Sequence, residues 1–328
     1  MMTSKKECTP CDQFTVDNIT EGINNVAKLD DMSACANCGK EGKSEDMNTC
    51  NKCKSVKYCN AACKKKHRKK HKKACERKVA ELHDEKLFAD PPPPEECPIC
   101  MLPLPLDGGD QVIFESCCGK TICSGCIHAM RESEGKSDLC AFCRTDAPFS
   151  DEEAIERLHR LMDKDNAMAF SMIAGYYIKG SAGLPQDYQK ANELYLKGGE
   201  LGNAGAYFNL SSSYRLGRGV SMDMKKFKHY CELAAMMGDV HARHNLGNME
   251  GQAGNYHRAM KHMMIAARAG FDMSLEIVRR GFMISGDVTK DEYESTLHAY
   301  HDRQKEMKSD ARDRATAQEN LEDYLNLV

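Results

Sequence analysis

The placement of cysteines is the feature that most restricts how this chain can fold. Of its 18 cysteines, 17 lie before residue 150, and most of them stand in pairs separated by two residues. Such a pair can turn both thiols toward one ion, as in structural zinc sites. The 328 residues are enough for several domains. We therefore expect small zinc-stabilised units in the first half and an ordinary helical region after residue 150.

The N-terminal segment indicates the cellular compartment in which the cysteines are expected to lie. Residues 1–31 are mixed and polar, and no apolar run approaches the roughly 18 residues of a membrane span. We expect a soluble intracellular protein, cytoplasmic, nuclear or both, with no membrane partner. In a reducing compartment, paired cysteines are metal ligands more often than disulfides. Cys8 and Cys11 share only their spacing with redox pairs, and the tail 1–34 is expected to be disordered.

Eight potential metal ligands follow one another between residues 35 and 75. They are Cys35, Cys38, Cys50, Cys53, Cys59, Cys63, His71 and Cys75. Because zinc takes four ligands in a closed structural site, this string makes two sites. His71 and Cys75 are one helical turn apart, so both can face the same ion.

This string, with Tyr58 directly before Cys59 and the ending His71-x3-Cys75, closely resembles the MYND zinc finger. The resemblance implies two interleaved structural sites. One would use Cys35, Cys38, Cys59 and Cys63, and the other Cys50, Cys53, His71 and Cys75. MYND fingers commonly bind proline-containing peptides through a Gln directly after the sixth ligand and a Trp four residues later. Lys64 and Arg68 occupy those positions here, so the fold carries over while peptide binding is left open.

The run from Lys64 to Lys73 holds eight Lys or Arg residues and two histidines. One interpretation is the solvated face of a short helix that closes the finger, and the other is a nuclear-import or nucleic-acid patch. No aromatic residues interrupt the run to stack on bases, which favours the solvated face.

A linker is expected over residues 76–96. A charged helix should occupy 76–90, and four consecutive prolines, Pro91 to Pro94, should end it. Prolines in a row favour an extended polyproline segment, which would act as a semi-rigid spacer.

A second set of eight potential ligands begins at residue 97. It comprises Cys97, Cys100, Cys117, Cys118, Cys123, Cys126, Cys140 and Cys143, so two further zinc ions and a total of four are predicted. The opening CPIC, the CGKTIC step and the closing pair followed by Arg resemble a RING finger of the all-cysteine variety, placed at 97–148. The resemblance implies a cross-brace. Cys97, Cys100, Cys123 and Cys126 would hold one ion, and Cys117, Cys118, Cys140 and Cys143 the other.

Adjacent Cys117 and Cys118 depart from the RING pattern, because neighbouring side chains point apart in an extended strand. A local kink is needed if Cys117 is a ligand. Without it, the second site would lack a fourth protein ligand.

RING fingers hold a ubiquitin-conjugating enzyme and do no covalent chemistry themselves. The resemblance implies that Ile99 docks this enzyme and that Arg144 acts as a linchpin between enzyme and ubiquitin, using its several donors. The alternatives are a minor structural role for Ile99 and an ordinary surface charge for Arg144. Ala141 and Ile127 replace a Pro and a Trp that are common in such fingers.

Helical repeats are expected after the second finger. Ser150 to Glu153 forms a capping box that opens a helix. A pattern starting at Asp187 recurs at intervals of 36 and 32 residues, with small residues at fixed helical positions. This period indicates stacked helix pairs, an α-solenoid that binds protein partners.

The run from Gly183 resembles the Sel-1-like repeat, a relative of the tetratricopeptide repeat, with three copies over about 166–271 and a degenerate fourth near 272–304. We assign 150–310 to these repeats and 311–328 to a charged C-terminal helix or tail. The alignment makes Cys231 a buried packing residue. A second capping box, Thr289 to Glu292, begins a long charged helix.

The fold class is therefore multi-domain, with two zinc fingers followed by an all-α solenoid. The leading hypothesis is a RING-type ubiquitin ligase whose repeats, with the first finger, recruit protein substrates. The rival is a non-catalytic scaffold for protein–protein interaction. Nucleic-acid association through residues 64–73 is compatible with either. No phosphate loop, serine triad or paired-carboxylate site points to a small-molecule enzyme.

Overall fold

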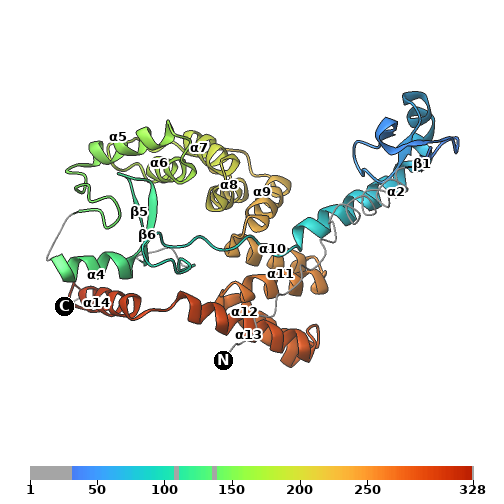
Figure 1. The fold of residues 1–328 in the computed structure, drawn as a ribbon. Helices are drawn as coiled ribbons and strands as arrows, with labels where there is room; N and C mark the ends of the chain where they lie inside the picture. Colours follow the sequence, from blue (N-terminus) through green and yellow to red (C-terminus); the bar gives the residue numbers. More distant parts are fainter. Residues whose placement is uncertain (1–31, 107–110, 135–138, 327–328) are drawn as a thin grey trace, which may run out of the picture. The chain divides into compact units, whose positions relative to one another are not determined.

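The computed structural model describes residues 32–106, 111–134 and 139–326, and Cys8 and Cys11 lie outside them. The chain forms two compact units, Met1–Glu85 and Lys86–Val328. Figure 1 shows both units and labels most of their helices. Within the described ranges, no helix is both long and apolar enough to cross a membrane.

The first unit consists of two small hairpins and the beginning of a long helix. Strand β1 (Met32–Ala34) pairs antiparallel with β2 (Glu41–Lys43), and after the short 3₁₀ helix η1 (Ser44–Asp46), β3 (Asn48–Thr49) pairs with β4 (Lys57–Tyr58). Helix α2 (Ala61–Leu87) follows without a break, so the helices expected at His71 and over 76–90 are one element. The core contains Met47, Tyr58 and four cysteines, too little apolar surface to hold the fold without metal cross-links.

The second unit begins at the end of α2. Leu87 is fully buried among helices of the repeats, and Arg243 donates a hydrogen bond to its carbonyl oxygen. The proline segment follows, and a Cβ on Gly238 would lie 3.7 Å from Cγ of Pro92. Strands β5 (Val112–Glu115) and β6 (Lys120–Cys123) form an antiparallel hairpin in the register Val112↔Cys123, and α4 (Ser124–Glu134) follows.

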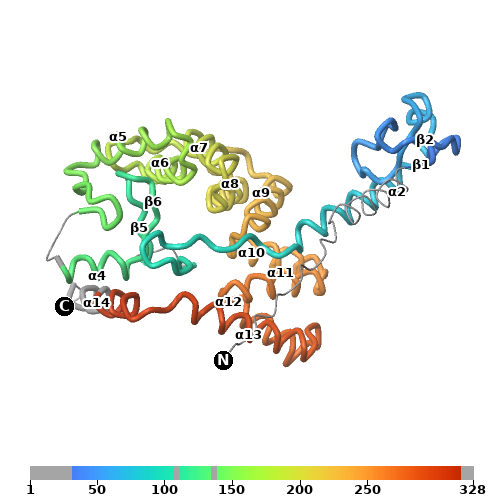
Figure 2. Tube along the Cα trace, in the orientation of Figure 1, coloured from blue at the N-terminus to red at the C-terminus, as the bar shows by residue number. Residues whose placement is uncertain are grey.

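The repeats are a sequential stack of helices, visible as an arc in Figure 2. The helices are α5 (Asp151–Met162), α6 (Ala167–Lys179), α7 (Tyr188–Glu200), α8 (Ala204–Leu216), α9 (Met224–Met236), α10 (Val240–Gln252), α11 (Tyr256–Arg268), α12 (Asp272–Arg280) and α13 (Lys290–Met307). A π-helical turn, η2 (Gly281–Ser285), precedes α13, and α14 (Asp310–Asn326) ends the chain. From α5 to α13, each helix packs against the next, as the internal repetition predicts.

Small residues let these helices approach closely, which confirms the interpretation of the repeat pattern. A Cβ on Gly199 would lie 2.4 Å from the ring of Tyr207. Cys231 is fully buried, and its repeat equivalents Tyr195 and Met263 are buried as well, at most 6 % exposed. The side chain of Cys231 donates to Oγ of Ser211 at 3.3 Å, so it is a packing residue.

The two helix starts predicted from capping boxes, at Ser150 and Thr289, are both capped in the structure. The capping box of Thr289 and Glu292 is complete. At α5 the Ser150 hydroxyl accepts from the N–H of Glu153, but the Glu153 carboxylate accepts from Phe149 instead of Ser150. The predicted capping box at Ser150 is therefore only half formed, because the carboxylate is also held by Arg157.

Candidate metal centres

Four of the Cys-x2-Cys segments fold in the same way. The residue after the second cysteine has a left-handed backbone, and its N–H donates to the carbonyl of the first cysteine. The residues are Gly39 (φ 75°, 2.8 Å), Lys54 (φ 56°, 3.0 Å), Met101 (φ 58°, 2.9 Å) and Arg144 (φ 62°, 3.0 Å). Only glycine adopts this conformation without cost. Three non-glycine residues are nevertheless held there, so the turn that brings each pair of thiols together is a defining feature of both fingers.

These turns and the neighbouring elements bring the predicted ligands into four groups. The groups are Cys35, Cys38, Cys59, Cys63; Cys50, Cys53, His71, Cys75; Cys97, Cys100, Cys123, Cys126; and Cys117, Cys118, Cys140, Cys143. In each group the four ligand atoms lie within 4.8 Å of one another. All sixteen ligands named from the sequence are brought together, in the interleaved sets that the resemblances imply. We call residues 35–75 the first finger and residues 97–143 the second finger.

The separations between ligand atoms fit zinc. With a zinc–sulfur bond of about 2.3 Å, two thiolates of a tetrahedral site lie about 3.8 Å apart. The Sγ atoms of Cys38 and Cys59, and those of Cys50 and Cys75, are 3.7 Å apart. In the second finger the separations are 3.8 Å for Cys97–Cys126 and Cys100–Cys123, and 3.9 Å for Cys118–Cys140. A disulfide of about 2.05 Å is excluded at these distances.

The second group of the first finger combines three thiols with an imidazole. Nε2 of His71 lies 3.3 Å from Sγ of Cys53, and the Ser55 hydroxyl donates to the same sulfur at 3.0 Å. The His67 ring stacks on His71 and its Nδ1 lies 3.3 Å from the hydroxyl of buried Tyr58. Hydrogen bonds of this kind orient ligands and stabilise thiolates. In the first group, the backbone N–H of Cys59 lowers the pKa of Cys35 to about 6.

Beside this second group lies a basic groove of about 730 Å³. Six of its lining residues are cationic: Lys52, Lys64, Lys65, Arg68, Lys69 and Lys72. The ammonium group of Lys64 donates to the Thr49 carbonyl and to Oδ1 of Asn51, both at 2.8 Å. The two positions where MYND fingers carry a Gln and a Trp therefore belong to a positively charged surface.

The adjacent pair Cys117 and Cys118 lies in the turn between β5 and β6, not in an extended strand. Gly119 has a φ of +69°, and its N–H donates to the Glu115 carbonyl at 2.8 Å. This turn supplies the required kink. Cys117 reaches Cys143 at 3.3 Å between sulfurs, closer than the other thiol pairs, while Cys118 reaches Cys140.

Ile99 and Arg144 both lie on the surface of the second finger. Ile99 is 41 % exposed between two ligands, and Arg144 is exposed directly after the last ligand. Ile127 is only 6 % exposed and belongs to the finger's own core. Phe142 was not predicted from the sequence. It is 45 % exposed between the last two ligands, and Nζ of Lys120 lies 6.0 Å from its ring centre. The sequence did contain a signal for this exposure, because Phe142 stands between two metal ligands. When the flanking thiols turn toward the ion, the side chain between them points to solvent.

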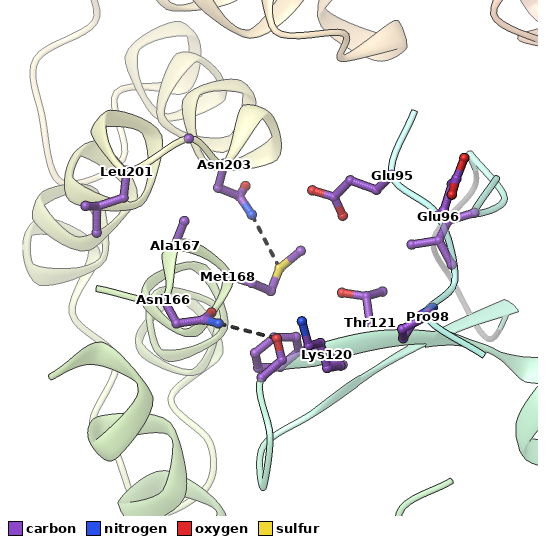
Figure 3. Close-up of a pocket in the computed structure, with 14 residues that line it drawn as sticks. Glu95, Glu96, Pro98, Lys120, Thr121, Asn166, Ala167, Met168, Leu201 and Asn203 are labelled. Carbon is purple, nitrogen blue, oxygen red and sulfur yellow. Dashed lines mark hydrogen bonds between the residues drawn. The ribbon is translucent and has the colours of Figure 1, made fainter. Parts of the chain in front are cut away.

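A cavity of about 440 Å³ lies where the second finger meets the repeats (Figure 3). Asn166 caps α6 by accepting from Ala169 and also donates to the Gly119 carbonyl at 3.3 Å. Nδ2 of Asn203 lies 3.4 Å from the sulfur of Met168. The described lining includes Glu95, Glu96 and Lys120 but no histidine or cysteine, so it offers no metal ligand set of the kind found in the fingers.

Comparisons with known proteins give one family match and a set of structural neighbours. A search of curated proteins found no match. The Sel1 repeat protein from Oxalobacter formigenes is 22 % identical over 46 % of this chain and 64 % of its own, with a TM-score of 0.40. The antigen c5321 of uropathogenic Escherichia coli, with an SLR fold, is 20 % identical over 59 % of this chain and 42 % of its own, with a TM-score of 0.36. The chain thus spans less than two thirds of either structure. Residues 35–75 match the MYND finger family.

Proposed function

We propose that the chain binds four zinc ions and acts as a RING-type ubiquitin ligase. Two ions would belong to each finger, one for each ligand group. All four would be structural, because every group already offers four protein ligands and leaves no open position. The sequence resemblance of the second finger to RING fingers and the separations between its thiols support this assignment.

The observation that carries the ligase proposal is the exposed surface made by the two Cys-x2-Cys turns of the second finger. Ile99 and Phe142 project between ligands and are 41 % and 45 % exposed. Apolar residues held on rigid turns are suited to docking a partner. The backbone is already ordered before binding, so no conformational entropy of the turn is lost. A conjugating enzyme would dock here.

Arg144 would act on the docked enzyme. In the transfer, a lysine amine of the substrate attacks the thioester carbonyl, an amide bond forms, the carbon–sulfur bond breaks, and the enzyme's cysteine leaves as a thiol. The guanidinium of Arg144 would donate to enzyme and ubiquitin together and hold the thioester in an attackable geometry. Its left-handed backbone, enforced by the N–H of Arg144 donating to Cys140, would fix where the side chain starts.

The repeats would recruit the substrate. Stacked helices present an extended surface for proteins, and the described repeats run from α5 to α13. The basic groove of the first finger would add a second contact, suited to acidic partners by charge.

A non-catalytic scaffold is the second candidate, favoured by one observation. Ile127, at the position where many RING fingers expose a Trp, is buried in the finger's own core. A docking surface without this residue lacks one exposed aromatic anchor, and a few such anchors supply most of the binding free energy of a protein interface.

Ubiquitin-chain formation by the purified full chain, tested across a panel of conjugating enzymes, separates the two candidates. The ligase proposal expects chains with at least one enzyme and none after zinc removal. Inactivity with every enzyme, while metal analysis gives four zinc ions, would favour the scaffold.

A further inference from the structure

The C-terminal helix packs on the second finger. Helix α14 lies beside α4, as Figure 1 shows. Gly125 of α4 makes the contact close, because a Cβ there would lie 2.7 Å from the backbone nitrogen of Arg312. Ala315, three residues further along α14, is 2 % exposed. Small residues on both helices thus bring the α14 backbone directly against the finger.

From this contact, the Arg312 side chain reaches a metal-ligand group. Nη1 donates to the carbonyls of Pro103 and Met307, both at 2.7 Å. Nη2 donates to the Leu102 carbonyl at 3.4 Å and to Sγ of Cys100 at 3.5 Å. Arg312 is only 6 % exposed, which is rare for an arginine unless it is paired.

The charge of the ligand group explains why a buried guanidinium is stable there. Four thiolates around a divalent ion carry a net charge of about −2. Cys97 and Cys123 of this group are 0 % and 1 % exposed, so water screens this charge poorly. The positive charge of Arg312 offsets about half of it, and its N–H group restrains the Cys100 sulfur. Outer partners of this kind typically change metal affinity by about 10–100-fold.

We propose that Arg312 is a positioning residue for the metal centre of Cys97, Cys100, Cys123 and Cys126, and that metal binding there is linked to docking of α14. The inference rests on the zinc ions of the proposed function. Linkage is reciprocal, so the helix strengthens metal binding by the same free energy by which the metal strengthens helix docking.

Thiol protection measured cysteine by cysteine tests this linkage. The zinc-loaded full chain is exposed to a chelator and N-ethylmaleimide, and alkylated peptides are mapped by mass spectrometry over time. In Arg312→Ala, the four thiols of this centre should be alkylated about tenfold faster or more. The thiols at 117, 118, 140 and 143 and those of the first finger should keep their wild-type rates.

Two further variants guard against a general folding defect. Arg314→Ala removes a neighbouring arginine of α14 that does not reach the thiols. Its ion pair with Glu132 of α4, at 3.7 Å, is solvent-exposed and contributes little to helix docking, so the alkylation rates should stay close to wild type. Gly125→Ala displaces α14 while keeping Arg312, and it should expose the same four thiols.

Wild-type rates in Arg312→Ala would overturn the inference. So would equal acceleration of all eight thiols of the finger, which would indicate a merely structural role. Metal analysis of the wild type shows whether the proposed function itself fails. A second finger that binds no zinc would overturn both the proposed function and this inference.

Discussion

Nη2 of Arg312 donates to Sγ of Cys100 at 3.5 Å, although the two residues are 212 positions apart. The contact joins the end of the chain to a finger near its middle. The second finger, the repeats and α14 belong to the same compact unit, Lys86–Val328. We therefore expect metal removal to destabilise the second finger most, α14 next, and the central repeats least.

Chelation should loosen the fingers and α14 while leaving the central repeats protected. Metal binding and folding are one equilibrium in small zinc units, whereas α6–α11 bury apolar clusters of their own. Hydrogen exchange with mass spectrometry, before and after chelation, should show faster exchange over 35–143 and in α14. Equal loss of protection in α7 and α9 would show instead that the whole second unit unfolds together.

Replacing Cys117 should remove zinc from the second finger. Its sulfur lies 3.3 Å from Cys143 and completes a set of four ligands, so Cys117→Ser should lower the zinc content by at least one ion per chain. Elemental analysis of the purified protein measures this. Cys231→Ala serves as the control, because that thiol is buried in the repeats and should leave the zinc content unchanged. An unaltered zinc content in Cys117→Ser would exclude Cys117 as a ligand.

If the chain is a ligase, substitution of Ile99 should weaken docking of the conjugating enzyme, whereas substitution of Arg144 should slow ubiquitin transfer from the docked enzyme. Ile99→Ala and Phe142→Ala remove exposed apolar area, so raising the concentration of the loaded conjugating enzyme should restore their activity. Arg144→Ala removes orienting donors and should stay about tenfold or more slower at saturation. Lysine discharge from a preloaded enzyme measures both, with unchanged zinc content as the control. Full activity of Arg144→Ala would eliminate the linchpin role.

The left-handed turns predict a matched pair of stability changes in the first finger. Lys54 has a φ of 56°, so Lys54→Gly should raise the finger's free energy of unfolding by up to about 1 kcal/mol. Gly39 has a φ of +75° and open space around its missing Cβ, so Gly39→Ala should lower it by a similar amount. Thiol protection of Cys35 and Cys50 in increasing guanidinium reports both. Effects of the same sign in the two variants would contradict the shared turn geometry.

Close helix packing predicts a second matched pair in the repeats. Gly199→Ala would place a methyl group 2.4 Å from the Tyr207 ring and should destabilise the repeats by about 1–3 kcal/mol. Gly175, in α6, has no atom within 4 Å of a built Cβ, so Gly175→Ala should stabilise by about 0.5–1 kcal/mol. Guanidinium unfolding followed by circular dichroism measures both. Tolerance of Gly199→Ala would mean that the two helices can separate at little cost.

The sequence by itself determined the features that depend on neighbours along the chain. Cysteines two residues apart can turn toward one ion because the intervening turn is short, so spacing alone predicted the pairs that begin at Cys35 and Cys97. The resemblance to known fingers was needed to combine these pairs with their partners into sets of four. Periodic small residues predicted the burial of Cys231, because each repeat packs on the next in the same way. The position of Cys117 could not be predicted, since the kink depends on how β5 and β6 pair around Gly119.

Only the tertiary structure decided the contacts between distant segments. Arg312 resembles any surface arginine in the sequence, yet it reaches Cys100. Leu87 is buried because the repeat helices pack around it, and Arg243 donates to its carbonyl oxygen. Asn166 is an ordinary helix cap that also holds Gly119 of the second finger. Such contacts depend on the angles at which whole elements pack, which many side chains set jointly and no local pattern encodes.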